Sequence, residues 1–79
     1  MKKQRRSLMR HVVLRIDKLM EQYGLTQVEF AEKVGIRQAA ISQLARNHVA
    51  RISVDHLNRI INTFEIDDIS ELIIIEKEG

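Results

Sequence analysis

A chain of 79 residues makes one domain with a small hydrophobic core, and it is too short to hold a catalytic domain beside a regulatory one. Cysteine is absent, which excludes disulfides and thiolate metal sites, and no apolar run approaches the roughly 20 residues of a membrane span. The net charge of +2 is unevenly distributed along the chain: residues 1–51 hold 11 Lys and Arg against 4 Asp and Glu, whereas residues 52–79 hold 2 against 7. This asymmetry predicts that the first two thirds of the chain bind a polyanion.

The basic start, residues 1–7, is expected to be an arm that either tracks DNA or acts as a solubilising tail. No uninterrupted apolar segment follows it, so we expect no signal peptide and a cytoplasmic protein. Apolar residues then recur at helical spacing and predict a first helix, with Ser7 as N-cap and Gly24 as C-terminal stop. The apolar stripe of this helix contains Met9, Val12, Val13, Ile16, Leu19, Met20 and Tyr23.

The next two predicted helices are short and lie close together in the sequence. Thr26 and Glu29 have the spacing of a capping box at the start of the second helix, and Gly35 ends that helix. The third helix covers residues 38–46. Asn47 is expected to end it, because asparagine tolerates a left-handed backbone.

The last third of the chain predicts two more helices. Ser53 is the expected N-cap of a fourth helix, and Asp67 or Asp68 would cap a short fifth helix. Residues 73–79 form either a C-terminal tail or a strand: the β-branched Ile run favours a strand, although a helix could continue through it. The fold class predicted for residues 1–79 is therefore a compact all-α bundle of five helices, with a short C-terminal strand as an open alternative. The apolar stripe of the fourth helix contains Leu57, Ile60, Ile61 and Phe64.

The second and third helices meet the requirements of a helix-turn-helix, in which two helices cross steeply through a short turn. Ala31 supplies the small residue where the helices approach closely, and Gly35 supplies the positive φ that the turn needs. The positions that face the common core are all apolar, namely Phe30, Val34, Ile36, Ile41 and Leu44.

The segments "LTQVEFAEKVGI" and "AISQL" resemble the Cro/cI-type (XRE) helix-turn-helix family of phage and bacterial repressors, and the resemblance covers roughly residues 8–72. It implies a lambda-repressor-like DNA-binding domain with the third helix in the major groove. At matching positions, Gln38 and Gln43 would read base edges, with Ala39 and Ser42 between them, and Gln27 would contact a phosphate. The chemistry agrees, because a glutamine amide can bond bidentately to adenine and an alanine methyl can pack on thymine.

The sequence departs from the family beside the third helix. Arg37 replaces the usual Ser or Thr cap, and it would reach either a phosphate or a guanine. The family's usual "ENGK" is "ARNH" here, so Asn47 or its neighbour replaces a glycine stop. The loop after this helix lies along the DNA backbone in the family, which makes its polar residues candidates for phosphate contacts, the alternative being an ordinary polar loop. These candidates are Arg46, Asn47, His48 and Arg51.

Other chemistry has no support in the sequence. The three histidines, His11, His48 and His56, have no metal-ligand spacing, and no serine belongs to a catalytic arrangement. We therefore expect no enzymatic activity, no metal and no cofactor.

The function predicted from the sequence is a dimeric, sequence-specific repressor that binds a palindromic operator in double-stranded DNA. One alternative is the DNA-binding antitoxin of a toxin–antitoxin pair, which would also bind a toxin, with the acidic C-terminal third as the expected contact. An antirepressor is another expected protein partner. A second alternative is a basic helical module that binds an acidic protein. Ile73, Ile74 and Ile75 are the expected dimer interface, pairing with a second copy as an antiparallel strand or a packed helix end, unless they close the core of the monomer.

Overall fold

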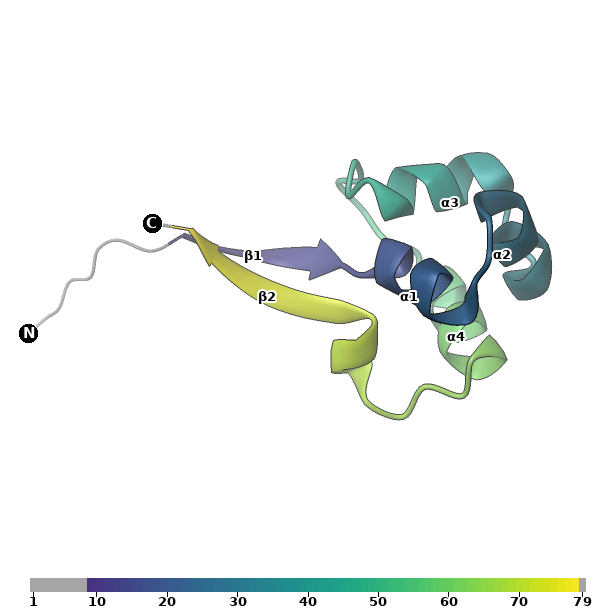
Figure 1. Ribbon diagram of the computed structural model, residues 1–79. Coiled ribbons are helices and arrows are strands. Elements are labelled where there is room, and N and C mark those ends of the chain that lie inside the picture. The colour runs from purple at the N-terminus through teal and green to yellow at the C-terminus, as the bar shows by residue number, and fades with distance from the viewer. Residues whose placement is uncertain (1–8, 79) are drawn as a thin grey trace, which may run out of the picture.

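The computed structural model describes residues 9–78 and consists of a helical body from which a two-stranded ribbon projects (Figure 1). The ribbon is formed by β1 (Met9–Leu14) and β2 (Ile73–Glu78), which pair antiparallel. Between them lie α1 (Ile16–Tyr23), α2 (Gln27–Val34), α3 (Gln38–Ala45), α4 (Val54–Thr63) and the 3-10 turn η1 (Ile69–Glu71). The molecule measures 50 × 25 × 23 Å, and its length comes from the ribbon.

The predicted all-α bundle of five helices is therefore wrong in two places. The first predicted helix is a strand over Met9–Leu14 and a helix from Ile16 onward, and the fifth is a single 3-10 turn. The apolar spacing near the N-terminus matched a helical period, but its valines also suit a strand, and pairing with β2 decides between the two. Ser7, the expected N-cap, lies outside the described residues.

The ends of the other helices agree with the sequence analysis. Thr26 and Glu29 form the capping box: the Glu29 N–H donates to Thr26 Oγ1 at 3.1 Å, and the Thr26 N–H donates to Glu29 Oε1 at 2.9 Å. Gly24 and Gly35 end α1 and α2 with φ of 64° and 72°, which glycine adopts without strain. Ser53 caps α4 by accepting from the His56 N–H.

Of the alternatives left open for residues 73–79, the strand is the one observed, and its partner within the chain is β1. In this ladder Leu14 pairs with Ile73, Val13 with Ile74 and Val12 with Ile75. At its inner end the ribbon joins the core, where Leu14 and Leu72 are buried. Farther out it is open to solvent, and Ile75 is 66% exposed. Just before β2, the backbone N–H of Ser70 donates a hydrogen bond to Asp68 Oδ1, and the Ser70 hydroxyl donates a second one. These bonds, the backbone one first, lower the pKa of the Asp68 carboxyl.

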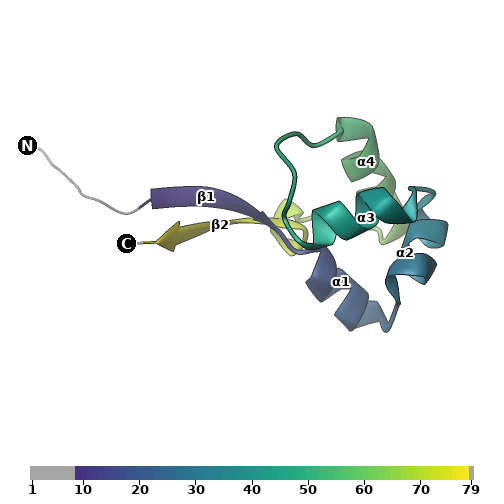
Figure 2. The same ribbon diagram turned by 90° about the horizontal axis from the view of Figure 1, so that it is seen from above.

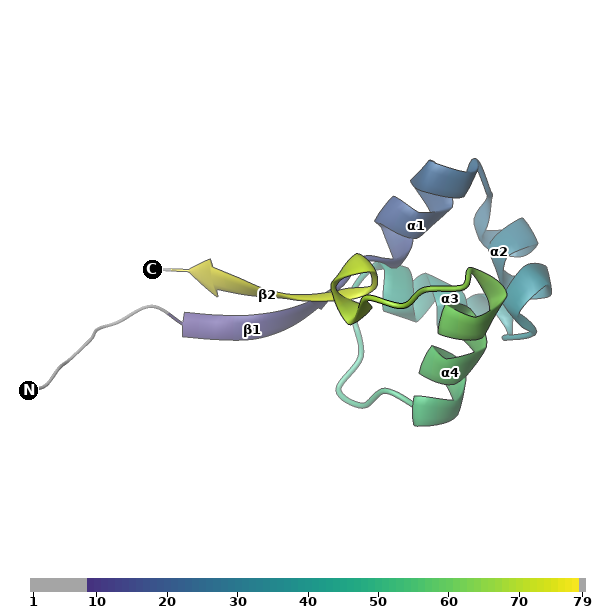
Figure 3. The same ribbon diagram turned by 90° about the horizontal axis from the view of Figure 1, so that it is seen from below.

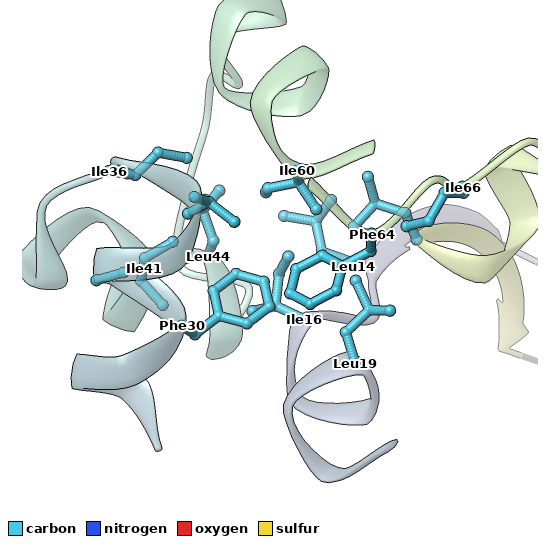
Figure 4. Close-up of a cluster of buried hydrophobic side chains, with 13 residues drawn as sticks. Leu14, Ile16, Leu19, Phe30, Ile36, Ile41, Leu44, Ile60, Phe64 and Ile66 are labelled. Carbon is cyan, nitrogen blue, oxygen red and sulfur yellow. The ribbon is translucent and has the colours of Figure 1, made fainter. Parts of the chain in front are cut away.

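The helical body is held by one hydrophobic core (Figure 4). Phe30 on α2 and Phe64 after α4 stack with their ring centroids 5.2 Å apart. Around them pack buried side chains from every helix, including Ile16, Ile41 and Ile60, which are fully buried. The core orients α3 because it takes up one side of that helix. The full set of buried residues is Leu14, Ile16, Leu19, Phe30, Ala31, Val34, Ile36, Ile41, Leu44, Ile60, Phe64, Ile66 and Leu72.

One polar side chain joins the end of α3 to the ribbon. The Leu14 N–H donates to Asn47 Oδ1 at 2.7 Å, and Asn47 Nδ2 donates to the Leu14 carbonyl at 3.2 Å. Asn47 has a φ of 58°, the left-handed conformation expected of the residue that ends this helix. These two hydrogen bonds, which we name the Asn47 bridge, fix the turn after α3 to β1.

The Asn47 bridge predicts a graded loss of stability. Asn47→Gly keeps the left-handed backbone but removes both hydrogen bonds, so we expect the free energy of unfolding to fall by about 1–2 kcal/mol. Asn47→Ala also strains the backbone and should cost roughly 1 kcal/mol more. Urea unfolding followed by circular dichroism measures both. Asn62→Ala is the control, because the Asn62 side chain donates to the Asn58 carbonyl one turn earlier on its own exposed helix face. If Asn47→Gly is as stable as this control, the bridge contributes nothing.

Candidate nucleic-acid interface

The turn between α2 and α3 is set by backbone geometry. Gly35 and Ile36 both donate their N–H groups to the carbonyl of Ala31, at 2.9 and 3.0 Å, which closes the end of α2. Arg37 then has an extended backbone, and α3 starts at the next residue. Ala31 is buried, and α2 and α3 pack against each other. The two helices therefore meet through a short turn, as a helix-turn-helix requires.

The third helix has one buried face and one open face. Ile41 and Leu44 point into the core and are 0% and 4% exposed. In Figure 1, α3 lies along the outside of the helical body, and Figure 2 views the molecule from that side. The residues predicted to read bases fall on the outer side of this helix: Gln38, Ala39 and Gln43 are exposed, and Ser42 is half-buried.

Two expected phosphate contacts lie at the starts of the helices. Gln27 is the first residue of α2 and is half-buried. Arg37 precedes α3 and is exposed, and its side chain makes no capping hydrogen bond. Neither residue belongs to the hydrophobic core.

The loop after α3 presents Arg46, His48 and Arg51 as exposed side chains. Its half-buried residues Val49 and Ile52 pack against the core and hold it beside α3. Asn47, the fourth expected phosphate contact of this loop, is placed differently, because its amide is engaged in the bridge to Leu14.

A hollow between α3 and the start of α4 brings together residues that are separate in the sequence. It has a volume of about 550 Å³, and both Gln43 and Arg51 line it. His56 and Ser53 also line it, although neither was predicted to lie at this surface. The helical period of α4 turns His56 toward α3, but the relative placement of the two helices was needed to recognise this.

The electrostatics of this surface favour an anionic ligand. No acidic residue occurs between Glu32 and Asp55, so α3 and both of its flanking turns carry cationic and neutral side chains alone. In the described part of the chain the ion pairs lie elsewhere, between Arg59 and Asp55 on α4 and between Lys18 and Glu21 on α1. Within residues 9–78, no salt bridge neutralises Arg37, Arg46 or Arg51 beside α3.

A family model described as a helix-turn-helix domain matches residues 1–67. The chain belongs to this helix-turn-helix domain family. Searches of curated proteins and of solved structures gave no match. The chain is thus a helix-turn-helix DNA-binding domain, and α2 and α3 form its helix-turn-helix. The family match ends before η1 and β2, so the second strand of the ribbon lies outside the matched region.

Residues 9–78 contain no cluster of three or more His, Asp or Glu side chains able to hold a metal ion. None of its helices has the length and apolar character required to cross a membrane.

Proposed function

We propose that this helix-turn-helix protein is a sequence-specific transcriptional regulator of the Cro/cI type, which represses by occupying an operator as a homodimer. The open face of α3 carries this proposal. It presents Gln38, Ala39 and Gln43 to solvent on a helix whose opposite face is fixed in the core. A face of amides and small side chains fits the major groove, whereas acidic side chains would be repelled by the phosphates.

In this proposal Gln38 and Gln43 read base edges. Each amide can donate and accept at the same time, which matches the N6 and N7 groups of adenine. Ala39 offers a methyl group for contact with thymine, and Ser42 lies between the two glutamines. A Cro/cI-type protein would place the start of α3 deepest in the groove.

Affinity in this proposal comes from contacts with the phosphates on both sides of the groove. Gln27 and Arg37 act from the helix starts, and Arg46, His48 and Arg51 act from the loop after α3. Arg37 could also reach a guanine. Asn47 contributes by holding this loop against β1, since its amide is bonded to Leu14.

A homodimer follows from the size of the reading surface. One recognition helix covers a few base pairs, which is too little for a unique address in a genome. Two copies related by a two-fold axis would read half-sites roughly 34–36 Å apart on a palindromic operator. We propose that the copies meet through Ile73, Ile74 and Ile75 in β2.

Selection of bound sequences from a random pool of DNA duplexes tests the function. We expect an enriched motif made of two inverted half-sites, with adenine at positions contacted by glutamine. If no sequence is enriched after repeated rounds, the proposal of a sequence-specific regulator is excluded. The alternative, a basic module that binds an acidic protein, would then be favoured.

Replacing Gln43 tests the reading face. Gln43→Ala should weaken binding to the selected operator by about 1–3 kcal/mol and relax the preference at one base pair, with little change on random DNA. Gln22→Ala is the matched control, because Gln22 is an exposed glutamine on α1. Fluorescence anisotropy with the operator duplex and with a random duplex measures the two affinities. If Gln43→Ala binds the operator as tightly as Gln22→Ala does, the outer face of α3 does not read the bases in the proposed orientation.

The loop arginines predict the salt dependence. Each phosphate contact releases counterions, so the operator affinity should fall steeply with salt. Arg46→Ala and Arg51→Ala should each reduce the log–log slope by about one and weaken all sequences alike. Lys18→Ala on α1 removes one positive charge outside the proposed surface and should leave the slope unchanged. A slope that is the same in the arginine variants and in Lys18→Ala would exclude this loop from the phosphate contacts.

A further inference from the structure

The outer edge of β2 presents unpaired backbone groups. The Arg15 N–H donates to the Leu72 carbonyl at 2.7 Å, which continues the β1–β2 ladder by one pair. Because backbone groups alternate in direction along a strand, those of Leu72 and Ile74 point to β1, and those of Ile73, Ile75 and Lys77 point away from it. No hydrogen bond within residues 9–78 engages the outward groups of Ile73, Ile75 or Lys77.

The outer edge of β1 differs, because its inner end is already occupied. The same alternation directs the backbone groups of Leu14 outward, and there they meet the amide of Asn47. The loop after α3 continues alongside, and Val12, Leu14, Val49 and Ile52 line a hollow of about 290 Å³. Among residues 9–78, β2 is therefore the edge on which no outward backbone group is hydrogen-bonded, whereas that of β1 is engaged at Leu14.

The projecting half of the ribbon also exposes apolar side chains. Val12 and Ile75 are cross-strand partners on one face, and they are 58% and 66% exposed. Figure 3 shows the ribbon extending beyond the helices with no helix over its outer part. An isolated two-stranded ribbon is marginally stable in water, and an exposed apolar edge strand tends to pair with a strand of another chain.

We propose that β2 pairs with β2 of a second copy of this chain, antiparallel across a two-fold axis at Ile75, to form a four-stranded sheet. This defines the register of the homodimer in the proposed function. The outward groups must face one another, which places the axis at Ile74, Ile75 or Glu76. With the axis at Ile75, each of the outward residues finds a partner: Ile75 pairs with its copy, and Ile73 pairs with Lys77 of the copy. Each alternative leaves one of them unpaired or opposite a residue outside the strand.

The side chains select the same register. An axis at Glu76 would place two carboxylates directly opposite each other, which is destabilising. The axis at Ile75 instead aligns Val12, Ile75 and their copies in one apolar row across four strands. Lys77 then lies beside Ile73 of the copy, where its aliphatic stem covers the isoleucine and its ammonium group stays in water.

Charge and symmetry disfavour the other strand pairings. Pairing two β1 strands would bring Arg10 close to its copy, and the bridge at Leu14 blocks part of that edge. Pairing β1 of one copy with β2 of the next is heterologous, so it would build a ring or an open filament and not a two-fold dimer. A second copy joined through β2 closes the assembly as a dimer.

Single-cysteine variants test the register, because the chain has no cysteine of its own. Residues opposite each other in a hydrogen-bonded pair have Cα atoms roughly 5.5 Å apart, which is within the range for a disulfide. Under mild oxidation without DNA, Ile75→Cys should form covalent dimers at least about ten times faster than Ile74→Cys, Glu76→Cys or His11→Cys, because the other positions do not face their own copies. Non-reducing electrophoresis measures the rates. Fastest cross-linking at any of the other positions would overturn this register.

A charge variant tests the interface without cross-linking. Ile75→Glu would place like charges on the axis and should give a monomer by analytical ultracentrifugation at concentrations where the parent is a dimer. Val54→Glu is the matched control, because Val54 is another exposed β-branched residue, on α4, and is 68% exposed. A parent chain that remains monomeric at high concentration, or an Ile75→Glu variant that stays dimeric, would refute the proposal; in the first case the β2 edge would be left for a strand of another protein. Because neither experiment contains DNA, their outcome is separate from that of the operator selection.

Discussion

The antiparallel pairing of β1 with β2 is the constraint on which the rest of the structure depends. It joins the two ends of the described chain and places Leu14 and Leu72 in the core beside residues from the helices. It also directs the outer backbone groups of Leu14 toward Asn47, which ties the end of α3 to the same strand. Without this ladder, the β1 segment would have no partner, and the turn after α3 would lose its anchor.

The third helix has to satisfy the core and the proposed ligand within eight residues. Ile41 and Leu44 supply the inner contacts, and their burial fixes how the helix is rotated about its axis. That rotation leaves Gln38 and Gln43 outside. The helix is short and has no side-chain cap, so packing of its apolar face against the core stabilises it more than its own helical propensity does. The same packing determines its orientation. A fixed rotation is what a surface needs if it is to present amides to base edges in one register.

The helix-turn-helix could be predicted from the sequence because its determinants are local. The capping box of Thr26 with Glu29 and the left-handed Gly35 each act within a few residues, and the apolar period of α2 and α3 identifies the buried face. The strand at the N-terminus could not be predicted in the same way. Met9, Val12 and Val13 fit a helical period as well as a strand, and the deciding interaction lies at the other end of the chain.

The same distinction applies to the candidate site. Exposure of Gln38, Gln43, Arg46 and Arg51 follows from the helical period and from their polarity, and the structure places all four on the surface. The position of His56 beside Gln43 depends on how α4 packs, which a local pattern does not contain. The engagement of Asn47 with Leu14 is a long-range contact of the same kind, and its side chain had been expected to face DNA.

The Asn47 bridge also gives the two proposed surfaces a rigid connection. The reading face lies on α3 and the proposed dimer edge lies on β2, and the path between them runs through Asn47, Leu14 and the β1–β2 ladder. The first step joins the Asn47 side chain to the Leu14 backbone by two hydrogen bonds, and the second is the backbone ladder between β1 and β2. A two-fold axis at Ile75 would therefore determine both the distance and the angle between the two recognition helices, because no flexible linker separates the strand from the helix. In such a dimer the spacing of the half-sites is a property of the ribbon, and a change in the β2 register would alter operator choice without touching a residue that reads a base.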